Sequence, residues 1–249
     1  GGTKLVWNGC VGAFGGVTNA IDMAHEFQSK MGERFLYYRM PDTDGWSEAY
    51  KALSAADEMA EGQDERVNMT HELQTVVRST CELLDLTWRD VKPRVLTNTE
   101  KVKLIALGDI GTKARSGVER DFRTKEITAV PKSEKPMRFS KVLRKIYLGM
   151  EMFGVDEESR WRVLQSIVFD SMPLARKTAL EFILETTKKD KDGASRQQIE
   201  KVMLCSESTV RRTLEELVLH GVLAHDADYI YFRPSKWLQE RLNTIRSKV

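Results

Sequence analysis

The chain has few cysteines and histidines and no long apolar run. Its three cysteines are far apart in the sequence and odd in number, which argues against a disulfide framework or a zinc site. The four histidines show no metal-ligand spacing, so no metal site is predicted. No apolar run approaches the roughly 20 residues of a spanning helix, and no signal peptide is recognisable. We therefore expect a cytoplasmic protein with no membrane contact.

The chain also lacks a phosphate-binding loop. The glycine-rich stretch "GCVGAFGG", residues 9–16, is not followed by the Gly-Lys-Ser/Thr that such a loop needs, and there is no GxGxxG motif. A tight turn at the end of a strand is the better interpretation. No Ser/His/Asp or Cys/His constellation is recognisable, and single acidic residues are too common to nominate a general base.

What the chain does have is an uneven distribution of charge. Residues 1–86 carry a net charge of −7, and residues 87–146 carry +9, within a chain whose net charge is +2. A strongly basic segment beside an acidic one predicts contact with phosphates, either of a nucleotide or of a nucleic acid. The alternative is a solvated linker.

The periodicity predicts a mostly α chain with a small α/β remnant. Residues 1–46 read as strand, loop, helix and strand, the end of an α/β domain. The last of these strands is an apolar run from Phe35 to Met40, which we expect to be buried, with Arg34 held rigidly at its start. Residues 47–170 read as a helical region that contains the basic segment 87–146.

Residues 171–249 predict a winged-helix domain. A helix opening at Pro173 precedes a short helix capped by Ser195, and a turn then leads to a second helix that Gly221 ends. Two short strands joined by "HDAD" follow and form a hairpin, the wing.

This arrangement predicts a DNA-binding surface. In a helix-turn-helix the N-terminal half of the second helix enters the major groove. Two further cations, just after the last wing strand, are placed to reach backbone phosphates. The candidate DNA-binding residues are Ser208, Thr209, Arg211, Arg212, Arg233 and Lys236. The alternative is that the domain packs against a neighbouring domain or a partner protein, which its low net charge and the acidic pair Glu215 and Glu216 favour.

Several short motifs resemble the MCM-like AAA+ ATPases and helicases of mobile genetic elements. "GGVTNAID" is followed by Glu33-Arg34-Phe35, an apolar run and "PDTD", similar in order to that family's sensor 1 and Ser-Arg-Phe motifs. "KPMRFSKVLRKIYLGMEMFGVDEESRWRVLQSI" looks like its sensor 2 helix and the helix that follows. The chain departs from the family where Glu33 replaces the serine and where Met137 stands between Pro136 and Arg138.

The resemblance implies an architecture and a set of roles. It implies the end of an AAA+ α/β core, a helical lid and a C-terminal winged helix, with ATP and Mg bound mainly by residues outside this chain. Arg34 would be the arginine finger acting in trans, Arg138 the sensor 2 residue, and Thr18 or Asn19 the sensor 1 residue. A finger acting in trans implies a head-to-tail homo-oligomer, which a hexameric ring would close.

On this interpretation the chain is the C-terminal portion of a DNA-dependent ATPase, a replicative-type helicase or loader, and should not hydrolyse ATP alone. We expect it to be part of a longer protein, because it opens with Gly1 and a strand. The rival hypothesis is a non-enzymatic winged-helix transcriptional regulator or adaptor. A regulator dimer needs a self-complementary interface, whereas an ATPase ring needs a head-to-tail one.

Overall fold

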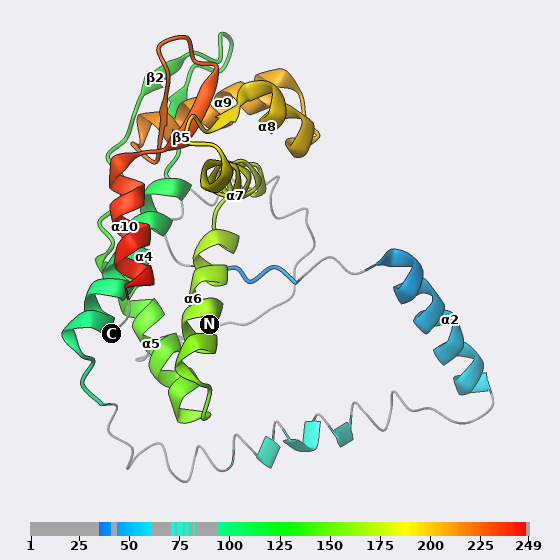
Figure 1. The fold of residues 1–249 in the computed structure, drawn as a ribbon. Coiled ribbons are helices and arrows are strands. Elements are labelled where there is room, and N and C mark those ends of the chain that lie inside the picture. Colours follow the sequence, from blue (N-terminus) through cyan, green and yellow to red (C-terminus); the bar gives the residue numbers. More distant parts are fainter. Residues whose placement is uncertain are drawn as a thin grey trace, which may run out of the picture.

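The computed structural model describes residues 35–40, 44–60, 71–72, 74–76, 78–79, 82 and 94–247, without the side chains of Glu48 and residues 55–60. Within these ranges the chain is mostly helical with two small antiparallel sheets (Figure 1). The prediction of a mostly α chain is thus confirmed. No helix in the described part is long and apolar enough to cross a membrane.

Three helices of the predicted helical region pack together. They are α4 (Asn98–Arg115), α5 (Met137–Met152) and α6 (Glu157–Asp170). Leu107, Leu143 and Leu164, one from each helix, are fully buried in their shared core. Between α4 and α5 lies a hairpin that the sequence analysis did not predict, formed by the antiparallel strands β1 (Glu119–Arg120) and β2 (Ile127–Ala129).

Two glycines allow α4 and α5 to approach closely. A side chain at Gly108 would overlap Ser140, and one at Gly111 would overlap the ring of Phe139. Both glycines are buried and lie one turn apart on α4. The absence of a Cβ therefore sets the distance between the two helices.

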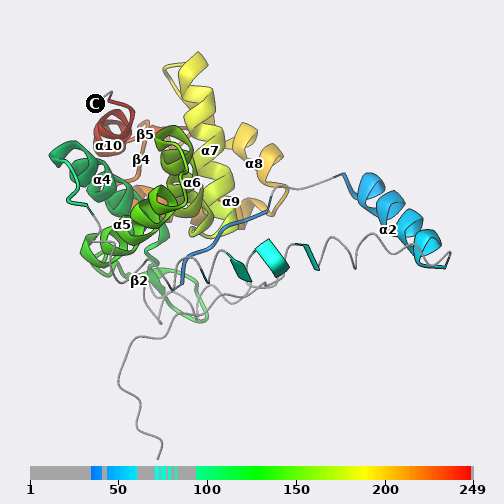
Figure 2. The same cartoon turned by 90° about the horizontal axis from the view of Figure 1, so that it is seen from below.

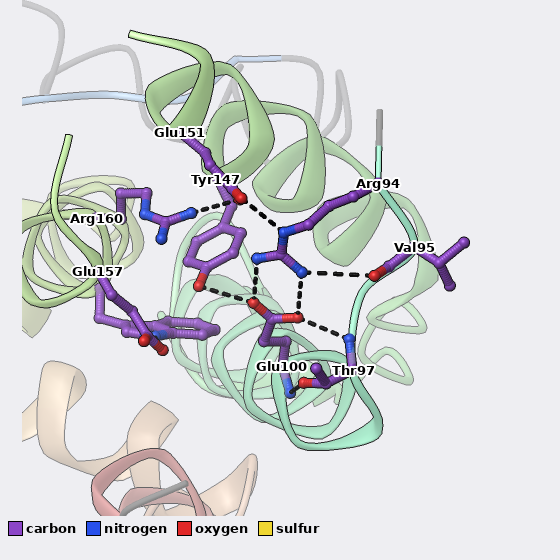
Figure 3. Close-up of polar contacts among 9 residues, drawn as sticks. Arg94, Val95, Thr97, Glu100, Tyr147, Glu151, Glu157 and Arg160 are labelled. Atoms are coloured by element: carbon purple, nitrogen blue, oxygen red, sulfur yellow. Dashed lines mark hydrogen bonds and ion pairs between the residues drawn. The ribbon is translucent and has the colours of Figure 1, made fainter. Parts of the chain in front are cut away.

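A polar network ties the start of α4 to α5 and α6 (Figure 3). The guanidinium of Arg94 donates to both carboxylate oxygens of Glu100, at 2.5 and 2.8 Å, and to Glu151 at 2.6 Å. Glu100 also accepts from the Tyr147 hydroxyl at 3.0 Å and from the backbone N–H of Thr97 at 2.7 Å. The hydrogen bonds from Arg94 are the largest cause that lowers the pKa of Glu100, to about 2. Because its members cap and join helices, we assign this network a structural role and not a functional one.

The C-terminal part begins with α7 (Leu174–Lys189), which opens directly after Pro173 as predicted. The remaining elements are β3 (Ala194–Ser195), α8 (Arg196–Met203), α9 (Glu207–Leu219), β4 (Leu223–His225), β5 (Tyr231–Pro234) and α10 (Lys236–Arg246). The three strands form an antiparallel sheet in the order β3-β5-β4. The helix-turn-helix and hairpin therefore occur in the predicted order. The hairpin strands begin one and two residues later than the starts at Val222 and Tyr229 that the sequence predicts.

The last helix returns to the first helix of the 94–247 body. Helix α10 packs against α4, where Arg241 Nε lies 2.8 Å from Asp109 Oδ2 and Lys113 Nζ lies 3.9 Å from the centre of the Trp237 ring. The buried apolar side chains of α4 to α10 form one continuous cluster. The predicted lid region and the predicted C-terminal domain thus share a core.

The prediction of a buried strand from Phe35 to Met40 is wrong. Residues 35–40 form no strand, and the side chains of Phe35, Tyr38 and Met40 are more than half exposed. The segment lies instead along the end of α6, where the N–H of Arg39 donates to Asp170 Oδ2 at 2.8 Å. An extended apolar run needs partner strands to become a buried strand, and the described residues supply none beside it. Helix α2 (Gly45–Ala60) comes next in the chain. Figure 1 shows it away from the body that residues 94–247 form.

Candidate nucleic-acid interface

Local capping positions the two helices of the helix-turn-helix. The Ser195 hydroxyl accepts from the N–H of Gln198, whose side chain bonds back to the Ser195 N–H, and together they form a capping box at the start of α8. Leu204 ends α8 in the left-handed conformation, with φ of 49°, and its side chain is exposed. The Ser206 hydroxyl then caps α9 by accepting from the N–H of Thr209.

The outward face of α9 carries the predicted DNA-binding side chains. Val210, Leu214 and Leu217 are buried on the inner face. A helix turns by about 100° per residue, so Ser208 and Arg212 project from the opposite side and Arg211 projects from the flank between the two faces. Of the four residues predicted on this helix, Ser208, Thr209 and Arg211 are exposed and Arg212 is half-buried. Neither arginine forms an ion pair with any described residue.

The acidic pair on α9 is engaged by two arginines. Arg120 of β1 lies 3.0 Å from a carboxylate oxygen of Glu215 and 3.1 Å from one of Glu216. Arg176 of α7 forms a second ion pair with Glu216. Glu215 and Glu216 follow Arg211 and Arg212 by one helical turn. Their charges are therefore largely balanced from within the molecule, whereas Arg211 and Arg212 in the N-terminal half of α9 have no ion pair among the described residues.

Arg176 also binds the end of α4. It is buried, and its guanidinium donates to the carbonyl oxygens of Ala114 at 2.9 Å and Ser116 at 2.6 Å. Burial lowers the pKa of Arg176, while the Glu216 carboxylate beside it opposes that shift. An arginine stays charged under such conditions, so it meets the partial negative charge of a helix C-terminus with a fixed positive one.

His220, at the end of α9, is a second tie between α9 and the segment around the β1–β2 hairpin. Its Nε2 lies 3.1 Å from the Gly117 carbonyl oxygen, and its Nδ1 lies 3.3 Å from Ser133 Oγ. Burial is the largest cause that lowers the pKa of His220. A neutral ring that donates from Nε2 and accepts at Nδ1 satisfies both contacts. His220 is thus a buried residue, and both of its ring nitrogens have partners inside the fold.

The wing holds the other two predicted residues. Arg233 lies on the exposed face of β5, opposite Ala224, and Lys236 is the exposed first residue of α10. The tip of the wing carries Asp226 and Asp228 and no cation. Asp226 accepts hydrogen bonds from the backbone of the tip, which lower its pKa. The structure thus places Arg233 and Lys236 away from the tip, towards the base of the hairpin.

The residues predicted to act on ATP are only partly described. Arg34, Thr18 and Asn19 lie outside the described residues. Arg138 lies in the first turn of α5, as predicted, with its side chain 60% exposed and Glu134 at 3.6 Å. In the described part of the chain, no group of three or more His, Cys, Asp or Glu side chains is placed to hold a metal ion.

Sequence reasoning missed Arg120 and Arg176, the partners of the acidic pair. A signal for Arg176 exists, because it precedes Ala179, Leu180 and Ile183 at helical spacing and so belongs to their buried face. An arginine on an apolar face needs an anionic partner. Arg120 gives no such signal, since its partners are 95 and 96 residues away in the chain.

Comparison with known proteins adds no relative to this description. No protein-family model matches the chain, and no curated protein or solved structure gives a significant match to it.

Proposed function

We propose that residues 171–249 form a winged-helix domain that binds duplex DNA through the N-terminal half of α9. The order of α7, β3, α8, α9 and the β4–β5 hairpin supports this assignment. In helix-turn-helix domains the N-terminal residues of the second helix contact base edges in the major groove. Arginine forks are suited to guanine edges and to phosphates.

The observation that carries the proposal is the division of charge along α9. Arg211 and Arg212 face outward without an anionic partner among the described residues, whereas Glu215 and Glu216 are bound by Arg120 and Arg176. The acidic pair was the main sequence argument against DNA binding. With the charge of that pair balanced internally, the N-terminal half of the helix carries Arg211 and Arg212 with hydroxyl groups beside them, and its one carboxylate, Glu207, lies 3.7 Å from Arg196.

The test is the affinity of the 249-residue chain for a labelled duplex, measured by fluorescence anisotropy at fixed salt. Replacing both Arg211 and Arg212 by alanine should weaken binding at least about tenfold, because each good arginine contact contributes about 1–3 kcal/mol. The matched control replaces Arg162 and Arg246, which are exposed on α6 and at the end of α10. Equal affinities for the two double variants would contradict the proposal.

We further propose that α4, α5 and α6 form the helical lid of an AAA+ ATPase, in which Arg138 contacts the γ-phosphate of ATP. The exposed guanidinium in the first turn of α5 favours this role, because it is available to an incoming anion. The ATP and Mg would be held mainly by residues outside this chain, and Arg34 would act on the nucleotide of a neighbouring subunit.

ATP hydrolysis by the full-length protein tests this second proposal. Arg138→Ala should lower the rate strongly, whereas Arg162→Ala should leave it unchanged. Arg34→Ala should also be inactive, and mixing it with subunits that keep Arg34 but lack a working phosphate loop should restore part of the rate. DNA binding without any ATP hydrolysis would instead support the winged-helix regulator, and a self-complementary dimer rather than a head-to-tail ring would support it further.

A further inference from the structure

A line of cations runs from the loop after β2 onto α5. Arg138, Lys141 and Lys145 are spaced by three and four residues, so they lie on one face of the helix. The opposite face, with Phe139, Leu143 and Tyr147, is buried. We call the exposed line the α5 stripe, and its members are Lys132, Lys135, Arg138, Lys141 and Lys145.

The α5 stripe is strongly positive and mostly unpaired. Residues 130–145 carry six basic residues and one acidic residue, Glu134. Glu134 lies 3.6 Å from Arg138. The four lysines of the stripe form no ion pair within the described part of the chain. Five exposed cations with a single weak partner repel one another, so a polyanion that approaches them relieves this repulsion.

The fold connects the α5 stripe to α9. The loop that carries Lys132 and Lys135 is tied to the end of α9, where Ser133 contacts His220 at 3.3 Å. The hairpin before that loop is tied to the outward face of α9 through Arg120. In Figure 2, α5 and β2 lie on the lower left side, and the far end of α7 points to the opposite side. The stripe thus begins near the C-terminal end of α9, about 12 Å along the helix axis from Arg212.

We propose that the four lysines of the α5 stripe bind the phosphate backbone of the same duplex that α9 engages, so that the DNA contact surface extends beyond the winged helix. This inference rests on the proposed function. The wing tip, with its two aspartates, is poorly suited to hold phosphates, and the stripe supplies the cations that the tip lacks. Lys141 and Lys145 lie about 6 Å apart along the helix axis, which is about two nucleotide steps along one strand. Flexible exposed lysines in a row fit a linear polyanion better than a single compact phosphate.

The salt dependence of DNA binding by the 249-residue chain tests the proposal. Replacing Lys141 and Lys145 by glutamine should weaken binding about tenfold at low salt. It should also reduce the slope of log affinity against log salt concentration by about 1.8, because each lost phosphate contact contributes about 0.9. Lys132→Gln with Lys135→Gln should act in the same direction. Arg138 is kept in all variants, since it is the proposed sensor 2 residue.

The matched control is Lys188→Gln with Lys189→Gln, which removes the same charge from the far end of α7, where both lysines are exposed beside Glu185. The control should leave the slope within about 0.5 of that of the original chain. If the α5 variants and the control behave alike while the Arg211 and Arg212 variant loses affinity, the stripe proposal fails and the winged-helix proposal stands. If no variant changes the affinity, both fail. Tighter DNA binding by the α5 variants would also overturn the stripe proposal. Unchanged affinity and slope would overturn it too, and this is the result expected if the stripe binds an acidic protein instead.

Discussion

Buried Arg176 and half-buried Glu216 form an ion pair that joins α7 to α9 across 40 residues of sequence. The same guanidinium holds the carbonyl oxygens at the end of α4, so one side chain connects three helices. This relationship orients α9 relative to the rest of the fold, and it leads to the first prediction.

Replacing Arg176 by methionine should lower the free energy of unfolding by about 3–5 kcal/mol, because Glu216 and the carbonyl oxygens of α4 lose their buried donor. Urea denaturation followed by circular dichroism measures the change. Adding Glu216→Gln to this variant should recover part of the loss, since the half-buried carboxylate that has lost its partner Arg176 is then removed. A single variant within about 0.5 kcal/mol of the original chain would show that the pair does not hold the helices together.

The close packing of α4 against α5 predicts opposite effects for two glycine substitutions. Gly111→Ala should destabilise the protein by about 1–3 kcal/mol, because the added methyl group overlaps the ring of Phe139. Gly149→Ala, on α5, should stabilise it by up to about 1 kcal/mol, since nothing lies within 4 Å of the added group and alanine favours the helix. Thermal unfolding of both variants tests the pair. A stabilised Gly111→Ala would mean that the two helices separate at little cost.

His220 predicts a loss of stability in mild acid. Its pKa in the fold lies below the ordinary 6.5, so its contribution to stability is fully present above pH 6.5. That contribution is lost as the pH falls from 6.5 through the lower pKa of the folded state, because the unfolded chain then binds more protons. The free energy of unfolding of the original chain should therefore fall more steeply between pH 7 and pH 5 than that of His220→Gln. Parallel pH profiles for the two proteins would rule out the buried neutral ring.

The network around Glu100 predicts a second acid transition, at lower pH. The pKa of Glu100 is lowered from 4.5 to about 2, so its stabilising effect is complete above pH 4.5 and is lost as the pH falls towards 2. Glu100→Gln should lower the free energy of unfolding at pH 7 by about 2 kcal/mol and reduce its dependence on pH in this range. Denaturation at pH 7, 4 and 3 measures both. A variant that keeps the full acid dependence would assign the transition to other carboxylates.

Tyr147 offers an independent check on the same network. Burial is the largest cause that raises its pKa, to about 12, and the hydrogen bond to Glu100 adds to the shift. Ultraviolet titration of the original chain and of Tyr147→Phe should therefore differ by one tyrosine that ionises near pH 12 and not near pH 10. If the missing tyrosine is one that ionises near pH 10, its hydroxyl is not held by Glu100.

The sequence predicted best those features that depend on neighbours along the chain. The helices of the C-terminal part are set by apolar spacing, by the caps Ser195 and Ser206 and by Gly221, all of which are local. These signals also placed Ser208, Thr209, Arg211 and Arg212 on the outward half of α9.

Features that depend on distant partners escaped prediction. The segment from Phe35 to Met40 looked like a buried strand, but hydrogen bonds to Asp170 and Ser171 hold it as an extended segment. The net charge of the surface around α9 depends on Arg120 and Arg176. These arginines pair with Glu215 and Glu216, which lie 40 to 96 residues away in the sequence. Formal charge counted along the sequence gives the total but not which charges cancel in space.

The contact between α10 and α4 has a mechanical consequence. Because Arg241 binds Asp109 and Lys113 lies over Trp237, the last helix is clamped to the first helix of the body at two points. Only residues 171–173 separate α6 from α7, and the two groups of helices share one buried core, so a movement of α4–α6 would be passed on to α7–α9. If nucleotide turnover moves the proposed lid, these contacts would carry the movement to α9 and to any DNA bound there.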